Sequence, residues 1–249
     1  MGRPKRWILD FTNGIQYVTL SSWKYFHDYL QESLIDSSNY IFRGQKEEEW
    51  KIEPTLIRHC REFKGIKFNT ILNSHLSNFK YSVRGRANNL KDIIDDEDEL
   101  WALGQHYGLK TPLLDFTDSP YVAAYFAFYE SDSDSKYRII YGLSQAAVKN
   151  HLKDDITFFK PLSGHNQRLI SQGGSFIKFK TENDIQTLIL NKFKSDESKI
   201  KLYVIRIPNN DRNLCLKFLN NMNINHNSLF PDLLGASIYS NTKLEIKNY

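Results

Sequence analysis

Residues 99–129, ELWALGQHYGLKTPLLDFTDSPYVAAYFAFY, contain a helix end, an extended segment and a helix start in direct succession. The first helix is expected to end at the glycines of GQHYG, because glycine readily adopts the conformation that closes a helix. TPLLDFT then indicates a short extended segment. The second helix has Asp118 or Ser119 as its cap and Pro120 at its first position, followed by alanines and aromatic residues. This stretch therefore predicts a helix, a strand and a second helix.

The residues before this stretch predict a helix, a strand and a longer helical region. SSWKYFHDYLQESLI, residues 21–35, places its apolar residues on one helical face behind a serine cap. YIFRG, residues 40–44, follows a polar turn and is typical of a strand. Residues 55–100 have mixed charge and are expected to be mainly helical, and the acidic run at 95–99 favours the start of the next helix.

The residues after it predict strands and one further helix. ESDSDSK is expected to be a turn or exposed loop, and YRIIYGL and KIKLYVIRIP indicate strands. NQRLISQGGSFIKF indicates a polar loop and the start of another strand, and NNDRNLCLKFLNNMN has helical spacing. No internal repeat, low-complexity linker or domain boundary is evident. We therefore predict an α+β fold, with one compact domain over residues 1–249 and an N-terminal helical approach.

The composition is that of an ordinary globular protein. The chain has 249 residues with 41% hydrophobic and 25% charged residues, and its net charge of +4 permits contact with nucleic acid without requiring it. The sequence has two cysteines without metal-ligand spacing, so we expect neither a disulfide framework nor a cysteine-based zinc site. With no run of about 18 apolar residues, we expect a cytoplasmic protein with no membrane association.

Familiar catalytic motifs are missing, so function has to be sought in other residues. The sequence has no Gly-x-Gly-x-x-Gly, Gly-x-x-x-x-Gly-Lys, His-Glu-x-x-His or Gly-x-Ser-x-Gly motif. Instead, polar residues interrupt strongly apolar segments: Arg43, Gln105, His106, Tyr107, Asp115, Arg168, Gln172 and Asp232. Each has a structural alternative as a cap, a turn residue or an ion-pair partner, and Arg43 in particular could pair with Glu47 or Glu53.

Four motifs resemble those of the FRG domain family, which is named for its Phe-Arg-Gly. They are, in order, YIFRGQ, QHYGLKTPLLDFTDSPYVAAYFAF, NQRLISQGGSF and SLFPDLLG, so the motif core runs from about residue 39 to residue 236 of a single FRG-type domain. The sequence departs from the family pattern at two positions. Pro112 stands where the family usually has arginine, so an anion contact of that arginine cannot be made here, and Phe116 stands where it usually has tryptophan.

The motif order also looks like that of a divergent ADP-ribosyltransferase, a fold with a central mixed or antiparallel sheet and flanking helices. The resemblance implies that Arg43 binds the phosphates or ribose of NAD, which would be the substrate. It implies that Thr117 and Ser119 match the strand that bears hydroxyl groups. The glutamate that the fold carries on a later strand has no counterpart, because the sequence there offers Gln167, Arg168 and Gln172.

Another carboxylate would have to replace this glutamate, either Asp115, Asp118 or Asp232, and Asp115 is the preferred candidate because it lies in the densest motif. The predicted catalytic residues are Asp115, His106 and Arg43. The predicted ligand-binding residues are Arg43, Gly44, Gln105, His106, Tyr107, Thr111, Thr117, Ser119, Arg168, Gln172 and Asp232. No metal site is predicted. We expect Arg43, Gln105, His106, Asp115, Thr117, Arg168 and Gln172 to share one cleft.

Three functions remain open from the sequence. The first is an NAD-dependent ADP-ribosyltransferase-like enzyme, such as a toxin or phage-defence effector that modifies a protein or nucleic acid. The second is a non-catalytic module that senses or binds a nucleotide. The third is a nucleic-acid-processing enzyme that uses His106 and the aspartates, which the basic charge favours modestly.

Overall fold

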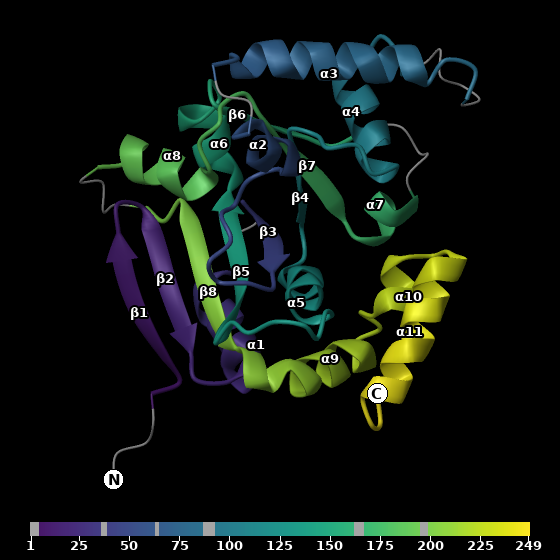
Figure 1. The fold of residues 1–249 in the computed structure, drawn as a ribbon. Helices are drawn as coiled ribbons and strands as arrows, with labels where there is room; N and C mark the ends of the chain where they lie inside the picture. The colour runs from purple at the N-terminus through teal and green to yellow at the C-terminus, as the bar shows by residue number, and fades with distance from the viewer. Residues whose placement is uncertain (1–4, 36–38, 63–64, 87–92, 162–166, 195–198) are drawn as a thin grey trace.

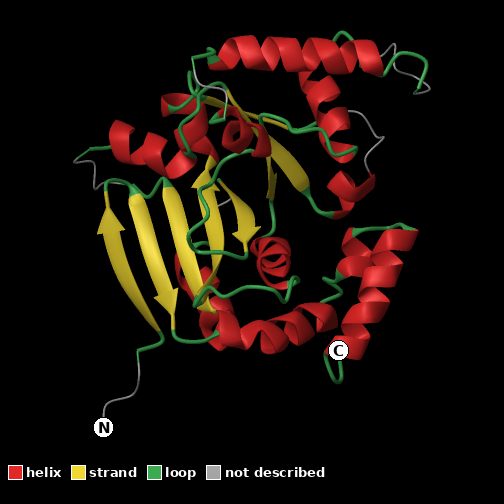
Figure 2. Cartoon of the chain, in the orientation of Figure 1, coloured by secondary structure: helices red, strands yellow, loops and turns green. Residues whose placement is uncertain are grey.

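The strands form one mixed, open sheet in this computed structural model, which describes residues 5–35, 39–62, 65–86, 93–161, 167–194 and 199–249 (Figures 1 and 2). Within these residues the strand order is β1-β2-β8-β5-β3-β4-β7-β6. Neighbouring strands are antiparallel except β2 and β8, which are parallel. The strands are β1 (Trp7–Thr12), β2 (Ile15–Leu20), β3 (Tyr40–Gln45), β4 (Leu113–Thr117), β5 (Tyr137–Ser144), β6 (Ile156–Phe159), β7 (Gly174–Phe179) and β8 (Leu202–Pro208).

Helices flank both faces of this sheet in a single compact domain (Figure 2). They are α1 (Phe26–Ser33), α2 (Thr55–Cys60), α3 (Phe68–Ser82), α4 (Glu97–His106), α5 (Pro120–Phe128), α6 (Gln145–His151), α7 (Gln167–Ser171), α8 (Ile185–Lys192), α9 (Arg212–Asn221), α10 (His226–Leu229) and α11 (Leu233–Glu245). Short 3-10 turns precede α1 (Trp23–Tyr25) and α9 (Asn209–Asp211). The predicted α+β class is confirmed.

Alternation along the strands divides the apolar residues into two cores. Ile41 of β3 belongs to the core shared with α2, α3, α4, α6 and α8, whereas the next residue, Phe42, belongs to the core shared with α1, α5 and α9. Successive side chains of a strand point to opposite faces, so β3 contributes to both cores. Arg43 therefore points to the same face as Ile41.

The fold begins with a β-hairpin, so the predicted N-terminal helical approach is wrong at its start. Thr12 of β1 pairs with Ile15 of β2 across a two-residue turn, Asn13-Gly14, whose φ angles of 48° and 83° are both positive. A tight hairpin turn requires this backbone conformation, and Asn-Gly is the pair that most readily adopts it. The predicted helix over 21–35 follows the hairpin as the first 3-10 turn and α1.

The central helix α5 begins as the sequence predicts. Of the two proposed caps, Ser119 is the one used: its hydroxyl accepts a hydrogen bond from the N–H of Val122, and Pro120 follows at the first helical position. The helix packs directly on β3. A Cβ atom at Gly44 would lie 1.8 Å from the carbonyl oxygen of Ala123, so only glycine allows this close approach.

Strands β3 and β4 separate almost as soon as they meet. Their ladder has one pair in the sheet, Phe42 with Thr117, whereas β3 pairs with β5 along its whole length. Beyond that pair, Arg43 to Gln45 of β3 diverge from Asp115 and Phe116 of β4. The backbone of β4 therefore lacks a continuous partner on this side, and the space between the strands is open to side chains.

Among the described residues, no helix combines the length and the apolar character that a membrane span requires.

Candidate ligand-binding site

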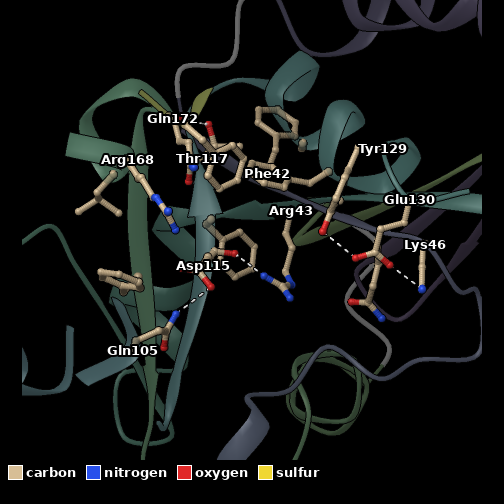
Figure 3. Close-up of a pocket in the computed structure, with 18 of the residues that line it drawn as sticks. Phe42, Arg43, Lys46, Gln105, Asp115, Thr117, Tyr129, Glu130, Arg168 and Gln172 are labelled. Atoms are coloured by element: carbon tan, nitrogen blue, oxygen red, sulfur yellow. Dashed lines mark hydrogen bonds and ion pairs between the residues drawn. The ribbon is translucent and has the colours of Figure 1, made fainter. Parts of the chain in front are cut away.

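A pocket of about 430 Å³ lies where β3 and β4 diverge (Figure 3). This volume is within the range of roughly 300–1,000 Å³ that is usual for small-molecule sites. The structure brings to its walls all seven residues that were expected to share a cleft: Arg43, Gln105, His106, Asp115, Thr117, Arg168 and Gln172. They come from β3, α4, β4 and the segment that contains α7, so the fold assembles the pocket from distant parts of the chain.

Asp115 is oriented by a short relay of hydrogen bonds from α4 and the loop before β4. The amide nitrogen of Gln105 donates to Asp115 Oδ2 at 2.8 Å, and the amide oxygen of Gln105 accepts from the hydroxyl of Thr111. The Thr111 hydroxyl in turn accepts from the N–H of Leu113 at 3.2 Å. Because Thr111 occupies the amide oxygen, the Gln105 side chain is held with its nitrogen toward Asp115. The other carboxylate oxygen, Oδ1, accepts no hydrogen bond from another described residue.

Arg43 reaches across the gap between the two strands. Its Nη1 donates to the backbone carbonyl of Asp115 at 2.9 Å, which satisfies a carbonyl that β3 does not pair (Figure 3). Its Nε is buried and has no hydrogen-bond partner among the described residues. The alternative pairing of Arg43 with Glu47 or Glu53 is wrong, because Glu47 accepts from Ser135 and Glu53 is bound by Arg61. Arg43 thus retains donors for a ligand.

The three predicted catalytic residues all have pKa values shifted against their charged forms. Desolvation raises the pKa of Asp115, although the charge of Arg43 and the hydrogen bond from Gln105 lower it in part. Desolvation also lowers the pKa of Arg43. The pKa of His106 is lowered by desolvation and by the nearby charge of Arg168. A water-accessible recess surrounded by protein has this effect, because the walls replace much of the hydration that charged groups need.

The wall formed by α7 is attached to β4 and to the C-terminal helices. The Thr117 hydroxyl donates to the carbonyl of Gln172 at 2.6 Å, and the Gln172 amide donates to the carbonyl of Leu229 at 3.1 Å. Arg168 donates from Nε and Nη2 to Asp232 Oδ2, at 2.8 and 2.5 Å. These contacts hold Arg168 and Gln172 at the pocket.

Four of the predicted ligand-binding residues do not line the pocket. Tyr107 is 76% exposed, and Thr111 is buried behind Gln105. Ser119 caps α5, and Asp232 caps α11 by accepting from the N–H of Gly235 at 2.8 Å. Gly44 does line the pocket, and its contact with α5 explains why it is glycine.

A second polar cluster in the pocket was not predicted. Glu130, just past the end of α5, accepts from the hydroxyl of Tyr129 at 2.6 Å and contacts Lys46 Nζ at 2.5 Å, and all three line the pocket (Figure 3). Lys46 also contacts Asp132 at 3.0 Å and lies over the ring of Trp50. The sequence carries only a weak signal for this cluster, since Glu130 begins the polar run ESDSDSK, which is expected to be a turn or exposed loop.

Two arginines hold the end of α5 that carries this cluster. Arg138 donates to the carbonyls of Ala127 and Glu130, and Arg212 donates to those of Phe128 and Tyr129. The last carbonyls of a helix have no partner within the helix, so these contacts satisfy them. Tyr129 and Glu130 are therefore presented to the pocket from a fixed backbone.

No group of three or more His, Cys, Asp or Glu side chains in the described part of the chain is placed to hold a metal ion.

The fold and this pocket define an α+β protein with a ligand-sized recess between two diverging strands. Residues 38–136 match the family model of the FRG domain, which confirms the resemblance over this part of the chain. The matched region includes the pocket residues of β3, α4, β4 and α5, whereas Arg168, Gln172 and Phe230 lie beyond it. No curated protein and no solved structure matches the chain.

Proposed function

We propose that this protein uses NAD as its substrate and transfers the ADP-ribosyl group to a protein or nucleic acid in the cytoplasm. The observation that carries the proposal is the placement of Asp115. Its carboxylate is oriented by Gln105, lies beside Arg43 and has one oxygen that no other described residue occupies. A carboxylate held in this way can stabilise positive charge that develops on a ribose ring.

In the proposed reaction, the bond between the ribose C1′ and the nicotinamide nitrogen breaks. The electron pair of the bond leaves with neutral nicotinamide, and Asp115 stabilises the positive charge that develops on the ribose. A hydroxyl or amine of the acceptor attacks C1′ and gives up its proton to His106, which is neutral at physiological pH because its pKa is lowered. Arg43 donates hydrogen bonds to ribose oxygens.

The direction of the Asp115 pKa shift supports a role other than stability. A pKa raised by folding means that the folded protein favours the protonated carboxyl, so ionised Asp115 destabilises the fold above the pKa of an unfolded aspartate. The charged form of Arg43 is also disfavoured in the folded protein, because its pKa is lowered. Groups whose charges oppose folding and that share a pocket are typical of functional sites.

The test is the isosteric variant Asp115→Asn, assayed for nicotinamide release at saturating NAD. We expect release to fall by roughly a hundredfold, the scale of one electrostatic catalytic group. The melting temperature at neutral pH should be unchanged, because Asp115 is exposed to the pocket and asparagine keeps the shape of its side chain. The matched control is Asp118→Asn, since Asp118 lies three residues further on, outside the pocket, and contacts Lys160. It should release nicotinamide at the wild-type rate.

Two results would contradict the proposal. Wild-type protein that does not bind NAD would exclude NAD as the substrate. Protein that binds NAD but releases no nicotinamide with any protein or nucleic-acid acceptor would be a nucleotide-binding module without transferase chemistry.

A further inference from the structure

Most of the positive charge in the pocket is already paired with carboxylates of the protein. Lys46 contacts Glu130 at 2.5 Å and Asp132 at 3.0 Å. Arg168 contacts Asp232 at 2.5 Å. A ligand would have to compete with these carboxylates for either cation. Neither cation is therefore a ready partner for a diphosphate.

We call Arg43 of β3 and Asp115 of β4 the floor of the pocket, and this floor offers one charge of each sign. Arg43 has donors to spare, but Asp115 lies next to it with an oxygen that no other described residue occupies. His106 adds no positive charge at neutral pH, because its pKa is lowered. A diphosphate placed on the floor would meet the carboxylate of Asp115 as well as the guanidinium of Arg43. Electrostatics at the floor therefore do not favour a dianion.

Aromatic rings make up much of the remaining lining. They are Phe42, Trp50, Phe116, Phe126, Tyr129, Phe176 and Phe230. Such rings stack with flat heterocycles, and their faces attract cations. Two of them already attract a cation within the protein: the guanidinium of Arg168 lies 5.3 Å from the centroid of the Phe230 ring, and Lys46 Nζ lies 5.7 Å from that of the Trp50 ring. A flat, positively charged ring matches both these rings and the available oxygen of Asp115.

We infer that the pocket receives the pyridinium-ribose end of NAD and leaves the diphosphate and adenine toward the opening. This inference rests on the proposed function and specifies which part of the substrate is recognised. The oxygen of Asp115 faces the positively charged end of the ligand. Reduction of the pyridinium removes its charge and its aromaticity, so the pocket selects the oxidised dinucleotide over the reduced one.

The experiment is calorimetric titration of the full chain, without acceptor, with oxidised NAD, reduced NAD, nicotinamide mononucleotide and ADP-ribose. Oxidised NAD should bind about tenfold more tightly than reduced NAD or ADP-ribose, a difference of ~1.4 kcal/mol. Nicotinamide mononucleotide in its oxidised form should retain most of the affinity. Asp115→Asn should bring the affinities for oxidised and reduced NAD together by weakening the oxidised form alone. Asp118→Asn should leave their ratio unchanged.

The outcomes separate this inference from the proposed function. If oxidised NAD, reduced NAD and ADP-ribose bind equally well, the recognised part is the shared adenosine diphosphate, and the inference is wrong while NAD remains the substrate. The inference is also wrong if Asp115→Asn weakens the oxidised and reduced forms equally. If none of the four compounds binds, the proposed function fails and this inference fails with it.

Discussion

Arg43 and Arg138 lie on neighbouring strands, β3 and β5, and each brings a guanidinium into the protein. Arg138 is 0% exposed, and three of its nitrogens donate: Nε to the side chain of Asn209, Nη1 and Nη2 to two carbonyls at the end of α5. Arg43 donates only through Nη1, to one carbonyl of β4, and its buried Nε lacks a partner among the described residues. Desolvation lowers the pKa of both.

The difference shows that burial and a shifted pKa do not by themselves separate a structural arginine from a ligand-binding one. The number of satisfied hydrogen-bond donors separates them, because buried donors in a protein core nearly always have a partner. Arg138 closes the end of a helix and has little capacity left for a ligand. Arg43 stands in a pocket with donors unused. The two residues should therefore respond differently to the same substitution.

The largest effect should come from Arg138→Met, which removes the charge and the donors but keeps much of the apolar volume. The buried carbonyl of Ala127 and the partly buried carbonyl of Glu130 would lose these partners. We expect a loss of about 3 kcal/mol or more in the free energy of unfolding. Urea denaturation measures this loss. A loss below about 1 kcal/mol would mean that the carbonyls at the helix end find other partners without Arg138. The assignment of Arg138 as a structural arginine would then be wrong.

Arg43→Met should have the opposite profile. Its single carbonyl partner lies at an open pocket where water can replace it, so we expect the free energy of unfolding to change by less than about 1 kcal/mol. Affinity for NAD should fall by about tenfold to a hundredfold, the range for losing hydrogen bonds to a charged donor. Calorimetry gives the affinity, and Arg84→Met, at an exposed arginine outside the pocket lining, provides the control. Unchanged affinity with a large loss of stability would make Arg43 a structural residue like Arg138.

Parts of the fold could be predicted because their causes are local. The start of α5 depends on a hydroxyl at Ser119, an N–H three residues later and the fixed φ of Pro120, which are adjacent in the sequence. Strand β3 followed from an apolar run, and Arg43 was identified because a charged residue interrupts it. The hairpin turn Asn13-Gly14 is equally local, because Asn-Gly between two extended segments is by itself a signal for a hairpin.

Other parts of the site depend on packing that no local pattern expresses. Lys46 and Asp132 are 86 residues apart and meet because the segments after β3 and α5 lie together. The carbonyl of Glu130 is held by Arg138 and that of Tyr129 by Arg212, and the positions of these arginines depend on β5 and α9. Thr111 was predicted to bind a ligand, but it acts on Gln105 from behind the pocket wall. The residue types at these positions indicate polar side chains, but they do not indicate where those side chains point.

A third arginine, Arg168, extends the comparison of Arg43 with Arg138, because its charge acts on the pKa of His106. Burial and the charge of Arg168 lower the pKa of His106, whereas Asp232 raises it. In Arg168→Gln the positive charge is lost and the negative one remains, so the pKa of His106 should rise. If His106 accepts the acceptor's proton, the acid limb of nicotinamide release should move to higher pH in this variant, since protonated His106 cannot act as a base.

Proton NMR of the imidazole signals measures this titration directly, and His106→Asn assigns the signal. A His106 signal that titrates at the same pH in wild type and Arg168→Gln would show that Arg168 does not act on it electrostatically. Arg168 would then resemble Arg138, because its role would be limited to the hydrogen bonds that it makes within the protein.

The smallest effect should come from Thr111→Val, which tests how firmly the floor is oriented. The Thr111 hydroxyl donates to the Gln105 amide oxygen, and without it the amide is free to turn its oxygen toward the carboxylate of Asp115. That orientation removes a hydrogen bond and adds repulsion between two acceptors. We expect nicotinamide release to fall by about two- to tenfold, the equivalent of one neutral hydrogen bond. Because Thr111 also accepts from the N–H of Leu113, some stability should be lost as well.

Thr111→Ser separates the two roles, since it restores the hydroxyl without the methyl group. Activity should recover in this variant even where stability does not. If activity follows melting temperature across Val and Ser, Thr111 supports β4 alone, and the orientation of Asp115 does not depend on the relay.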